Sequence, residues 1–266
     1  MTEPLVSIYT VVYNDETGIR KTIESVLNQT YKNIEYIIVD GGSTDSTIDI
    51  IKEYEKEISI FISEKDDGIY DAMNKAIEVS NGTLIGLLNS GDSFHSDAVE
   101  DIIQLYNENN SRNDIIYSGA MNKVNDKGEI VYTVRFNQKS LENKFYTMPI
   151  NHTSTFVPMK VFDKIGVYNL DLKITADYEF ILRALHYGVK IKYTNKVLAD
   201  MQMGGVSDDR IYKPNRLKEE YLLRYKYCSS FKTILIIAKQ TINSLLKTFI
   251  PNKILYTIYN SRYRKN

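Results

Sequence analysis

The first third of the chain alternates short apolar runs with segments of helical periodicity. The apolar runs, at residues 5–12, 36–39, 58–62 and 83–88, have the length and composition of buried strands. Between them, apolar residues recur every three or four positions, as they do along one face of an amphipathic helix. This β-α-β-α-β-α-β order requires crossover connections, which favour a mostly parallel sheet covered by helices. The sequence therefore predicts an α/β fold.

The chain is less regular from the fourth run to about residue 210. The helix after the second run is expected to open at Ser43 or Thr44, because both are good N-cap residues. The later elements expected are a strand at 114–118, a hairpin at 123–136 turning at 125–128, an extended stretch at 149–158, a short helix ending near Gly166 and a helix from Asp177.

The last part of the chain is strongly basic. From Ile211 onward there are twelve Lys and Arg residues and two Glu residues, a net charge of +10 that leaves −11 for the rest. Apolar residues keep helical spacing from 231 to 249, with lysines between them, which predicts a basic amphipathic helix. Such a helix either meets an anionic membrane surface or packs on the body of the protein or on a second subunit. We therefore divide the chain into residues 1–210 and a tail of residues 211–266.

Composition narrows the class of protein further. The lone cysteine, Cys228, excludes an internal disulfide framework and a thiolate metal cluster, which suits a reducing compartment. No segment approaches the roughly 18 apolar residues of a membrane-spanning helix, and the first residues lack a secretory signal. The acidic body contains no recognisable nucleic-acid-binding module, so no nucleic-acid partner is expected. We expect a cytoplasmic protein.

Polar clusters follow each of the four expected strands. They are Thr10 to Asn14, residues 40–43, residues 64–67 and residues 89–92. Each cluster alone has the composition of an ordinary turn. All four, however, end strands of one parallel half-sheet, and ligands of open α/β sheets bind at the carboxyl ends of the strands. The pattern predicts a binding crevice there.

Four acidic residues are the candidates for chemistry, and each has a simpler alternative. Asp92 offers a hard oxygen ligand for Mg²⁺ or Mn²⁺, or it caps the helix expected at 96–106. Asp40 accepts a hydrogen bond from a nucleobase or sugar, or caps a helix. Asp67 reaches the same ligand, or begins the next helix. Asp177 is either a general base for an acceptor hydroxyl or an N-terminal helix residue.

Several of these segments together resemble a known family. The stretches VSIYTVVYN (6–14), VDGGSTD (39–45), DGIYDAMNK (67–75) and LNSGD (88–92) are similar to those of family 2 glycosyltransferases. The resemblance is strongest to bacterial enzymes of O-antigen, capsule and colanic-acid assembly. It continues through His152, residues 176–180 and residues 204–207, and it covers about the first 210 residues.

The resemblance implies a GT-A fold, with a mostly parallel Rossmann-like sheet, an acceptor-side subregion and a C-terminal helical tail. It implies an inverting transfer from a nucleotide-diphosphate sugar, usually a UDP-sugar, with Mn²⁺ or Mg²⁺ on the diphosphate. Asp177 matches the catalytic base, and Asp92 matches the metal ligand of a D-x-D-type motif. Many relatives carry an acidic run such as Asp-x-Asp-Asp where this chain has Asn89-Ser90-Gly91-Asp92, so Asp92 is the one carboxylate left. Asn89 could still offer a neutral oxygen, directly or through water. The residues that would hold the nucleotide-sugar are Thr10, Tyr13, Asp40 and Asp67.

The same resemblance, with the basic tail, suggests an acceptor. An undecaprenyl-diphosphate-linked saccharide on the cytoplasmic face of the inner membrane would be reached by a peripheral enzyme with a basic amphipathic helix. The expected activity is hexose transfer, with glucose as the first choice and galactose next, in O-antigen or other lipopolysaccharide biosynthesis. A sugar-nucleotide-binding protein without turnover is the alternative, because the metal motif keeps one carboxylate.

Overall fold

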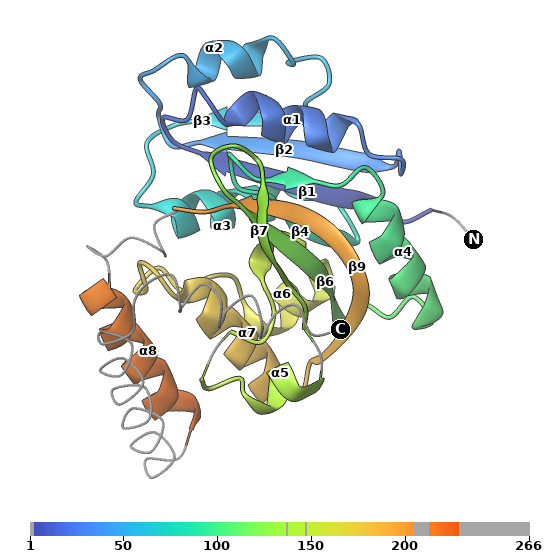
Figure 1. Cartoon of the computed structure of the whole chain (residues 1–266), viewed down its shortest axis with the longest axis vertical. Coiled ribbons are helices and arrows are strands. Elements are labelled where there is room, and N and C mark those ends of the chain that lie inside the picture. Colours follow the sequence, from blue (N-terminus) through green and yellow to red (C-terminus); the bar gives the residue numbers. More distant parts are fainter. Residues whose placement is uncertain (1–2, 137, 147, 205–212, 229–266) are drawn as a thin grey trace.

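The computed structural model describes residues 3–136, 138–146, 148–204 and 213–228. Helices cover both faces of one sheet (Figure 1). The strands are β1 Val6–Val12, β2 Ile34–Asp40, β3 Ile60–Ser63, β4 Leu84–Leu87, β5 Ser93–Phe94, β6 Ile115–Val124, β7 Ile130–Val134, β8 Thr155–Pro158 and β9 Lys190–Gln202. The helices are α1 Ile19–Leu27, α2 Thr47–Lys52, α3 Ile69–Val79, α4 Ala98–Glu108, α5 Gln138–Glu142, α6 Met159–Ile165, α7 Ala176–His186 and α8 Lys213–Tyr227, with the 3₁₀ turn η1 at His152–Ser154.

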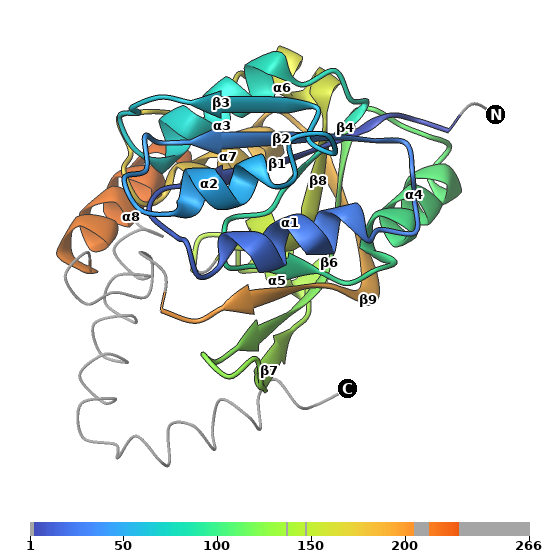
Figure 2. The same ribbon diagram turned by 90° about the horizontal axis from the view of Figure 1, so that it is seen from above.

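The first four strands form the predicted parallel half of the sheet. Their order is β3-β2-β1-β4, and β1 pairs in parallel with both β2 and β4. The side chains of successive β1 residues point to opposite faces of the sheet and pack in different cores. Ile8 packs under α1, α2 and α4, and Tyr9 packs under α3, α6 and α7. Figure 2 shows these two helical layers on opposite faces of the sheet. Every residue of β1 is buried because both faces are covered.

The second half of the sheet is mixed rather than parallel. β8 runs antiparallel to both β4 and β6, whereas β9 runs parallel to β6 and antiparallel to β5. The expected hairpin is confirmed, since β6 and β7 pair across a turn closed by a bond from Gly128 N to Asn125 O. The stretch expected to be irregular or extended becomes η1 followed by β8.

The two halves meet at Gly86 in the middle of β4. Gly86 faces Phe156 of β8, and a Cβ built on Gly86 would lie 2.6 Å from the Phe156 ring. Phe156 is fully buried and stacks on Phe94 of β5. Its ring therefore has no room to retreat, and the glycine allows the two strands to pack this closely.

Two local predictions differ from the structure. The helix expected to open at Ser43 or Thr44 is α2, which begins at Thr47. Ser43 instead uses its N–H and hydroxyl to bond Asp40, and the N–H of Thr44 bonds Asn14 Oδ1, so both residues belong to the preceding loop. Asp92 is not the cap of α4, because Asp97 occupies the N-cap position of that helix.

The described part of the tail packs on the body. Helix α8 belongs to the expected tail, because it begins after the boundary between residues 210 and 211. It packs against α7, as Figure 1 also shows. The amphipathic helix expected at 231–249 lies outside the described residues, and the division into two parts stays a prediction. Among the helices that the structure describes, none combines the length and apolar character needed to cross a bilayer.

A histidine–aspartate pair joins the end of β5 to β9 and makes stability depend on pH. His95 Nε2 lies 3.0 Å from Asp200 Oδ1, and this hydrogen bond raises the pKa of His95 and lowers the pKa of Asp200. A histidine whose pKa is raised by folding stabilises the folded protein at pH values below its pKa in the unfolded chain, about 6.5. This stabilisation is lost as the pH rises through the pKa of the folded protein.

We therefore expect the free energy of unfolding to fall between pH 6 and pH 8.5. The side chains are 36% and 29% exposed, so the change should stay below about 1 kcal/mol. Urea denaturation of the wild type and of His95→Gln at both pH values measures it. An equal pH dependence in the two proteins would contradict the assignment to His95.

Candidate active site

The loops after β1, β2 and β4 are joined to one another at the carboxyl edge of the parallel strands. Asp15 after β1 accepts a bond of 2.6 Å from the hydroxyl of Ser90 after β4. The N–H of Asn14 donates to the hydroxyl of Ser43 after β2, at 2.8 Å. Polar turns from three strands therefore form one continuous edge, as the sequence predicted.

Asp40 is fully buried at the end of β2 and organises the loop that follows. Its carboxylate accepts bonds from the N–H groups of Gly42 and Ser43 and from the hydroxyls of Ser43 and Ser63. The hydroxyl of Ser63 belongs to β3, so the same carboxylate joins two adjacent strands. In this structure Asp40 fixes the loop after β2 and ties it to β3.

The other residues expected to hold a nucleotide-sugar lie in different environments. Thr10 is buried inside β1, with its hydroxyl 3.0 Å from that of Tyr36. Tyr13, just beyond the same strand, is 63% exposed. Asp67 is exposed before α3, and its N–H bonds Asp71. Tyr13 and Asp67 thus have side chains accessible to a ligand, whereas the side chain of Thr10 faces the core.

Asp92 lies at the end of the loop that follows β4, directly before β5. It is 4% exposed, and its oxygens accept bonds from Gln202 N at 2.9 Å and from the Thr153 hydroxyl at 3.3 Å. Burial raises the pKa of Asp92 to about 6, against the opposing effect of the Gln202 hydrogen bond. The carboxylate therefore sits where a cation would stabilise its charged form.

Asp177 lies in the first turn of α7 and holds a fixed position. Its carboxylate is 3.2 Å from His152 Nδ1, 3.0 Å from the Tyr70 hydroxyl and 2.8 Å from the N–H of Tyr178. The side chain is 18% exposed, so it still reaches solvent. An acidic side chain at this end of a helix is favoured by the helix dipole. The arrangement suits a carboxylate that takes a proton from a bound hydroxyl.

The turn η1 links Asp177 and Asp92 through two neighbouring residues, His152 and Thr153. Asn89 Nδ2 lies 3.2 Å from His152 Nε2, and the opposite ring nitrogen faces Asp177. With Asn89 as donor, Nε2 is the acceptor and Nδ1 is the ring nitrogen that donates to Asp177. His152 precedes Thr153, which bonds Asp92. The turn η1 thus joins the expected base to the expected metal ligand.

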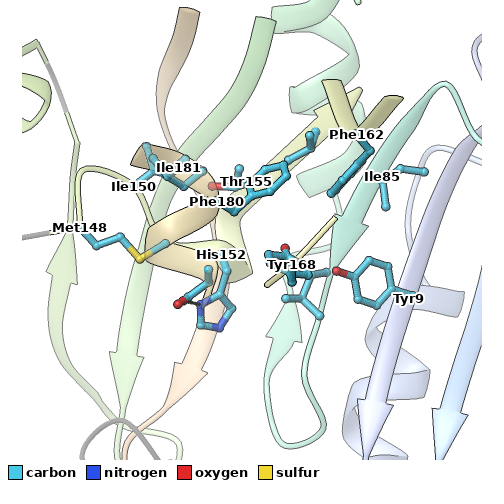
Figure 3. Close-up of a pocket in the computed structure, with 13 residues that line it drawn as sticks. Tyr9, Ile85, Met148, Ile150, His152, Thr155, Phe162, Tyr168, Phe180 and Ile181 are labelled. Carbon is cyan, nitrogen blue, oxygen red and sulfur yellow. Dashed lines mark hydrogen bonds and ion pairs between the residues drawn. The ribbon is translucent and has the colours of Figure 1, made fainter. Parts of the chain in front are cut away.

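A small cavity of about 20 Å³ lies beside this network. His152 and Asp177 border it, with Met148, Phe180 and other apolar side chains behind them. Figure 3 shows these side chains, with the Tyr9 hydroxyl pointing toward Tyr168. The volume holds a single water and no sugar ring, so substrates would have to bind above it, along the carboxyl edge of the sheet.

The donor set at Asp92 fits a metal ion brought by a diphosphate better than a resident ion. Within the described residues, no three His, Cys, Asp or Glu side chains gather into a cage. Mg²⁺ and similar ions are, however, often held by one carboxylate together with substrate phosphates. In the described part of the chain, Asn89 Oδ1 is buried without a hydrogen-bond partner, and Asn89 stands three residues before Asp92 in the same loop. These two side chains would be the protein ligands of an ion that arrives with the diphosphate.

The sequence analysis gave no role to Asp15, Tyr70, Thr153 or His152. Asp15 directly follows the cluster ending at Asn14, so including one more residue of that loop would have found it. The family resemblance includes His152, but the partners of His152 are 63 and 25 positions away. Only the fold brings them together.

Comparisons with known proteins agree with this arrangement. The sequence model of the protein family "Glycosyl transferase family 2" matches residues 7–166. An uncharacterized glycosyltransferase of Mycobacterium tuberculosis is 34% identical over 188 residues, which cover 68% of this chain and 69% of that protein.

The fold is similar to solved structures at low sequence identity. The crystal structure of S. aureus TarS matches with a TM-score of 0.64 and 19% identity, covering 88% of this chain and 42% of that one. A shorter TarS chain, solved with UDP-GlcNAc, has a TM-score of 0.64, 18% identity and coverages of 88% and 71%. A mannosyltransferase from Pyrobaculum calidifontis, solved with GDP-Man and Mn²⁺, has a TM-score of 0.60 and 12% identity, covering 100% of this chain and 89% of that one.

The strand order, the joined loops at the sheet edge and the Asp177 network thus occur in a chain that matches one family over more than half its length. The predicted α/β fold of GT-A type is confirmed by the solved structures. The chain belongs to the family 2 glycosyltransferases and is a glycosyltransferase.

Proposed function

We propose that this enzyme transfers a sugar from a nucleotide-diphosphate donor to an acceptor hydroxyl in one displacement with inversion. The observation that carries the proposal is the hydrogen-bonded series Asn89–His152–Asp177. It joins a carboxylate placed to accept a proton to the loop that carries Asp92. A base and a site for diphosphate charge are the two groups that such a displacement needs.

In this reaction the acceptor oxygen forms a bond to the anomeric carbon while the bond from that carbon to the diphosphate oxygen breaks. The acceptor proton passes to the Asp177 carboxylate, and the electron pair of the broken bond leaves with the diphosphate. Tyr70 and His152 each contact one carboxylate oxygen and hold the group in a single orientation. Orientation of this kind lowers the barrier because it is fixed before the reaction begins.

The carboxylate of Asp92 and the side-chain oxygen Oδ1 of Asn89 would hold Mn²⁺ or Mg²⁺ on the donor diphosphate. When bound, the ion offsets the charge that builds on the leaving group. The Mn²⁺ complex of the structurally similar mannosyltransferase supports this assignment. Tyr13, Asp40 and Asp67, together with the loop that follows Thr10 and the end of β1, would form the nucleotide side of the crevice.

The donor we propose is a UDP-hexose, with UDP-glucose first and UDP-galactose next. The UDP-GlcNAc complex of TarS and the GDP-Man complex of the mannosyltransferase support a nucleotide-sugar donor in this fold. The resemblance to O-antigen enzymes supports a UDP-linked hexose. A screen for release of UDP or GDP from a panel of nucleotide-sugars, with Mn²⁺ and a GlcNAc- or GalNAc-diphosphate-lipid, tests the choice. Donor binding without release would instead support a sugar-nucleotide-binding protein.

The acceptor we propose is an undecaprenyl-diphosphate-linked saccharide of surface-polysaccharide or O-antigen assembly, reached at the cytoplasmic face of the inner membrane. The net charge of +10 from Ile211 onward supports an anionic membrane surface as partner. Replacing Lys232, Lys239 and Lys247 by Glu in the full chain should reduce binding to anionic liposomes at least tenfold, since each basic residue near the surface contributes about 1 kcal/mol. Cosedimentation measures this. Unchanged binding would place the helix against the body or a second subunit.

A further inference from the structure

The segment that leads into α7 is fixed by a carboxylate from another helix. Glu219 of α8 accepts bonds from the N–H groups of Lys173, Ile174 and Thr175 at 2.9, 3.1 and 3.0 Å. Its Oε2 also accepts the Thr175 hydroxyl at 2.9 Å. Thr175 is the N-cap residue of α7, and its own side chain makes no capping bond within that helix. Glu219 therefore receives the N–H groups that precede α7 and have no partner within it.

The same segment is held on its other side by α3. The Tyr70 hydroxyl lies 2.9 Å from Ile174 O and 3.0 Å from Asp177 Oδ1. Lys173 Nζ reaches the backbone oxygen of Asp67 at 3.4 Å. Residues 173–175 thus lie between α8 and the loop that carries Asp67, two positions before Asp177.

Helix α8 is anchored independently of Glu219. Arg224 is 2% exposed, donates to Phe145 O at 2.8 Å and pairs with Glu220 at 2.7 Å. At the end of the helix, Tyr227 and Lys226 both bond Glu179 of α7, which is 1% exposed. A carboxylate on a helix fixed in this way can impose a position on the segment it binds.

We propose that Glu219 is a positioning residue for sugar transfer. By fixing residues 173–175, it sets where α7 presents Asp177 to the acceptor hydroxyl. This role rests on the proposed function of Asp177 as the base. A displacement of about 1 Å at a reacting group can lower a rate by about a hundredfold. Helix α8, which belongs to the expected tail of residues 211–266, thus contributes to catalysis.

The test compares variants of the full chain in the transfer assay. Glu219→Ala should lower kcat by about tenfold to a hundredfold, while the Kd for the donor stays within about twofold, because none of the residues that Glu219 bonds is one expected to bind the donor. Glu219→Gln should recover most of the rate, since its amide oxygen can take the place of Oε2 and keep three of the four bonds. The matched control is Lys218→Ala on the same helix, because the side chain of Lys218 is exposed and takes no part in these bonds, and it should leave kcat within about threefold.

Hydrogen–deuterium exchange gives a readout that is independent of activity. The amides of residues 173–175 should exchange faster in Glu219→Ala than in Lys218→Ala. If Glu219→Ala does not fold, Thr175→Val provides the test, because it removes one bond to Oε2 in nearly the same volume, and its kcat should fall about threefold or more. Unchanged kcat in the folded variant, or an equal loss in Lys218→Ala, would overturn the positioning role. Full transfer by Asp177→Asn would overturn the proposed function instead.

Discussion

Replacing Asp177 by Asn should abolish sugar transfer and leave UDP binding unchanged. The amide has nearly the shape of the carboxylate and can still accept from the N–H of Tyr178, so α7 keeps its first turn. It cannot take a proton from the acceptor hydroxyl. Loss of a general base lowers rates by about 10² to 10⁴, and a poor nucleophile such as a sugar hydroxyl places the effect toward the upper end.

The measurement is UDP release with donor, acceptor and Mn²⁺, together with the Kd for UDP by calorimetry. Asp163→Asn is the control, because Asp163 is an exposed carboxylate on the neighbouring helix α6. It should retain the wild-type rate. A fully active Asp177→Asn enzyme would exclude Asp177 as the base.

Replacing Asp92 by Asn should lower transfer about a hundredfold and raise the Mn²⁺ concentration needed for half the maximal rate. The charge lost is the one that would hold a cation on the diphosphate, and such ions contribute several kcal/mol to the transition state. Stability should not fall. The amide can still accept from Gln202 N, and the cost of burying a charged carboxylate is removed.

Rates measured over a range of Mn²⁺ concentrations, with the melting temperature at pH 7.5, separate these effects. Asp126→Asn is the control, because Asp126 contacts the Gln202 side chain from the exposed β6–β7 hairpin. Wild-type rates for Asp92→Asn at every Mn²⁺ concentration would show that Asp92 serves only to bond Gln202 and Thr153.

The parallel half of the fold could be predicted because its signals are local. Each of β1 to β4 is a short apolar run followed by a helical pattern, and both are visible within a few residues. Strand β9 gave no such signal, because its thirteen residues mix Lys, Thr, Asn and Asp with apolar positions, and only four of them are buried in the structure, namely Ile191, Leu198, Ala199 and Met201. Its partner β6 lies some 75 positions earlier.

The candidate site divides in the same way. Asp92, Asn89 and Asp177 stand at recognisable ends of elements, so their positions could be predicted. The orientation of Thr10 could not, because it depends on helices that cover both faces of β1. The contact of Asp15 with Ser90 could not either, because it joins loops 75 positions apart. Residue type and position along an element are local properties, whereas hydrogen-bond partners are set by the packed fold.

The place of β9 in the sheet has a consequence for how the chain is made. Between β8 and β9, strand β6 presents ten buried residues, and its pairing with β9 forms only after residue 202 has been synthesised. Until then one side of β6 is an unpaired, largely apolar edge, which is prone to pair with other chains. A fragment that ends with the family match at residue 166 leaves this edge open, so nascent or truncated chains are the form most exposed to aggregation.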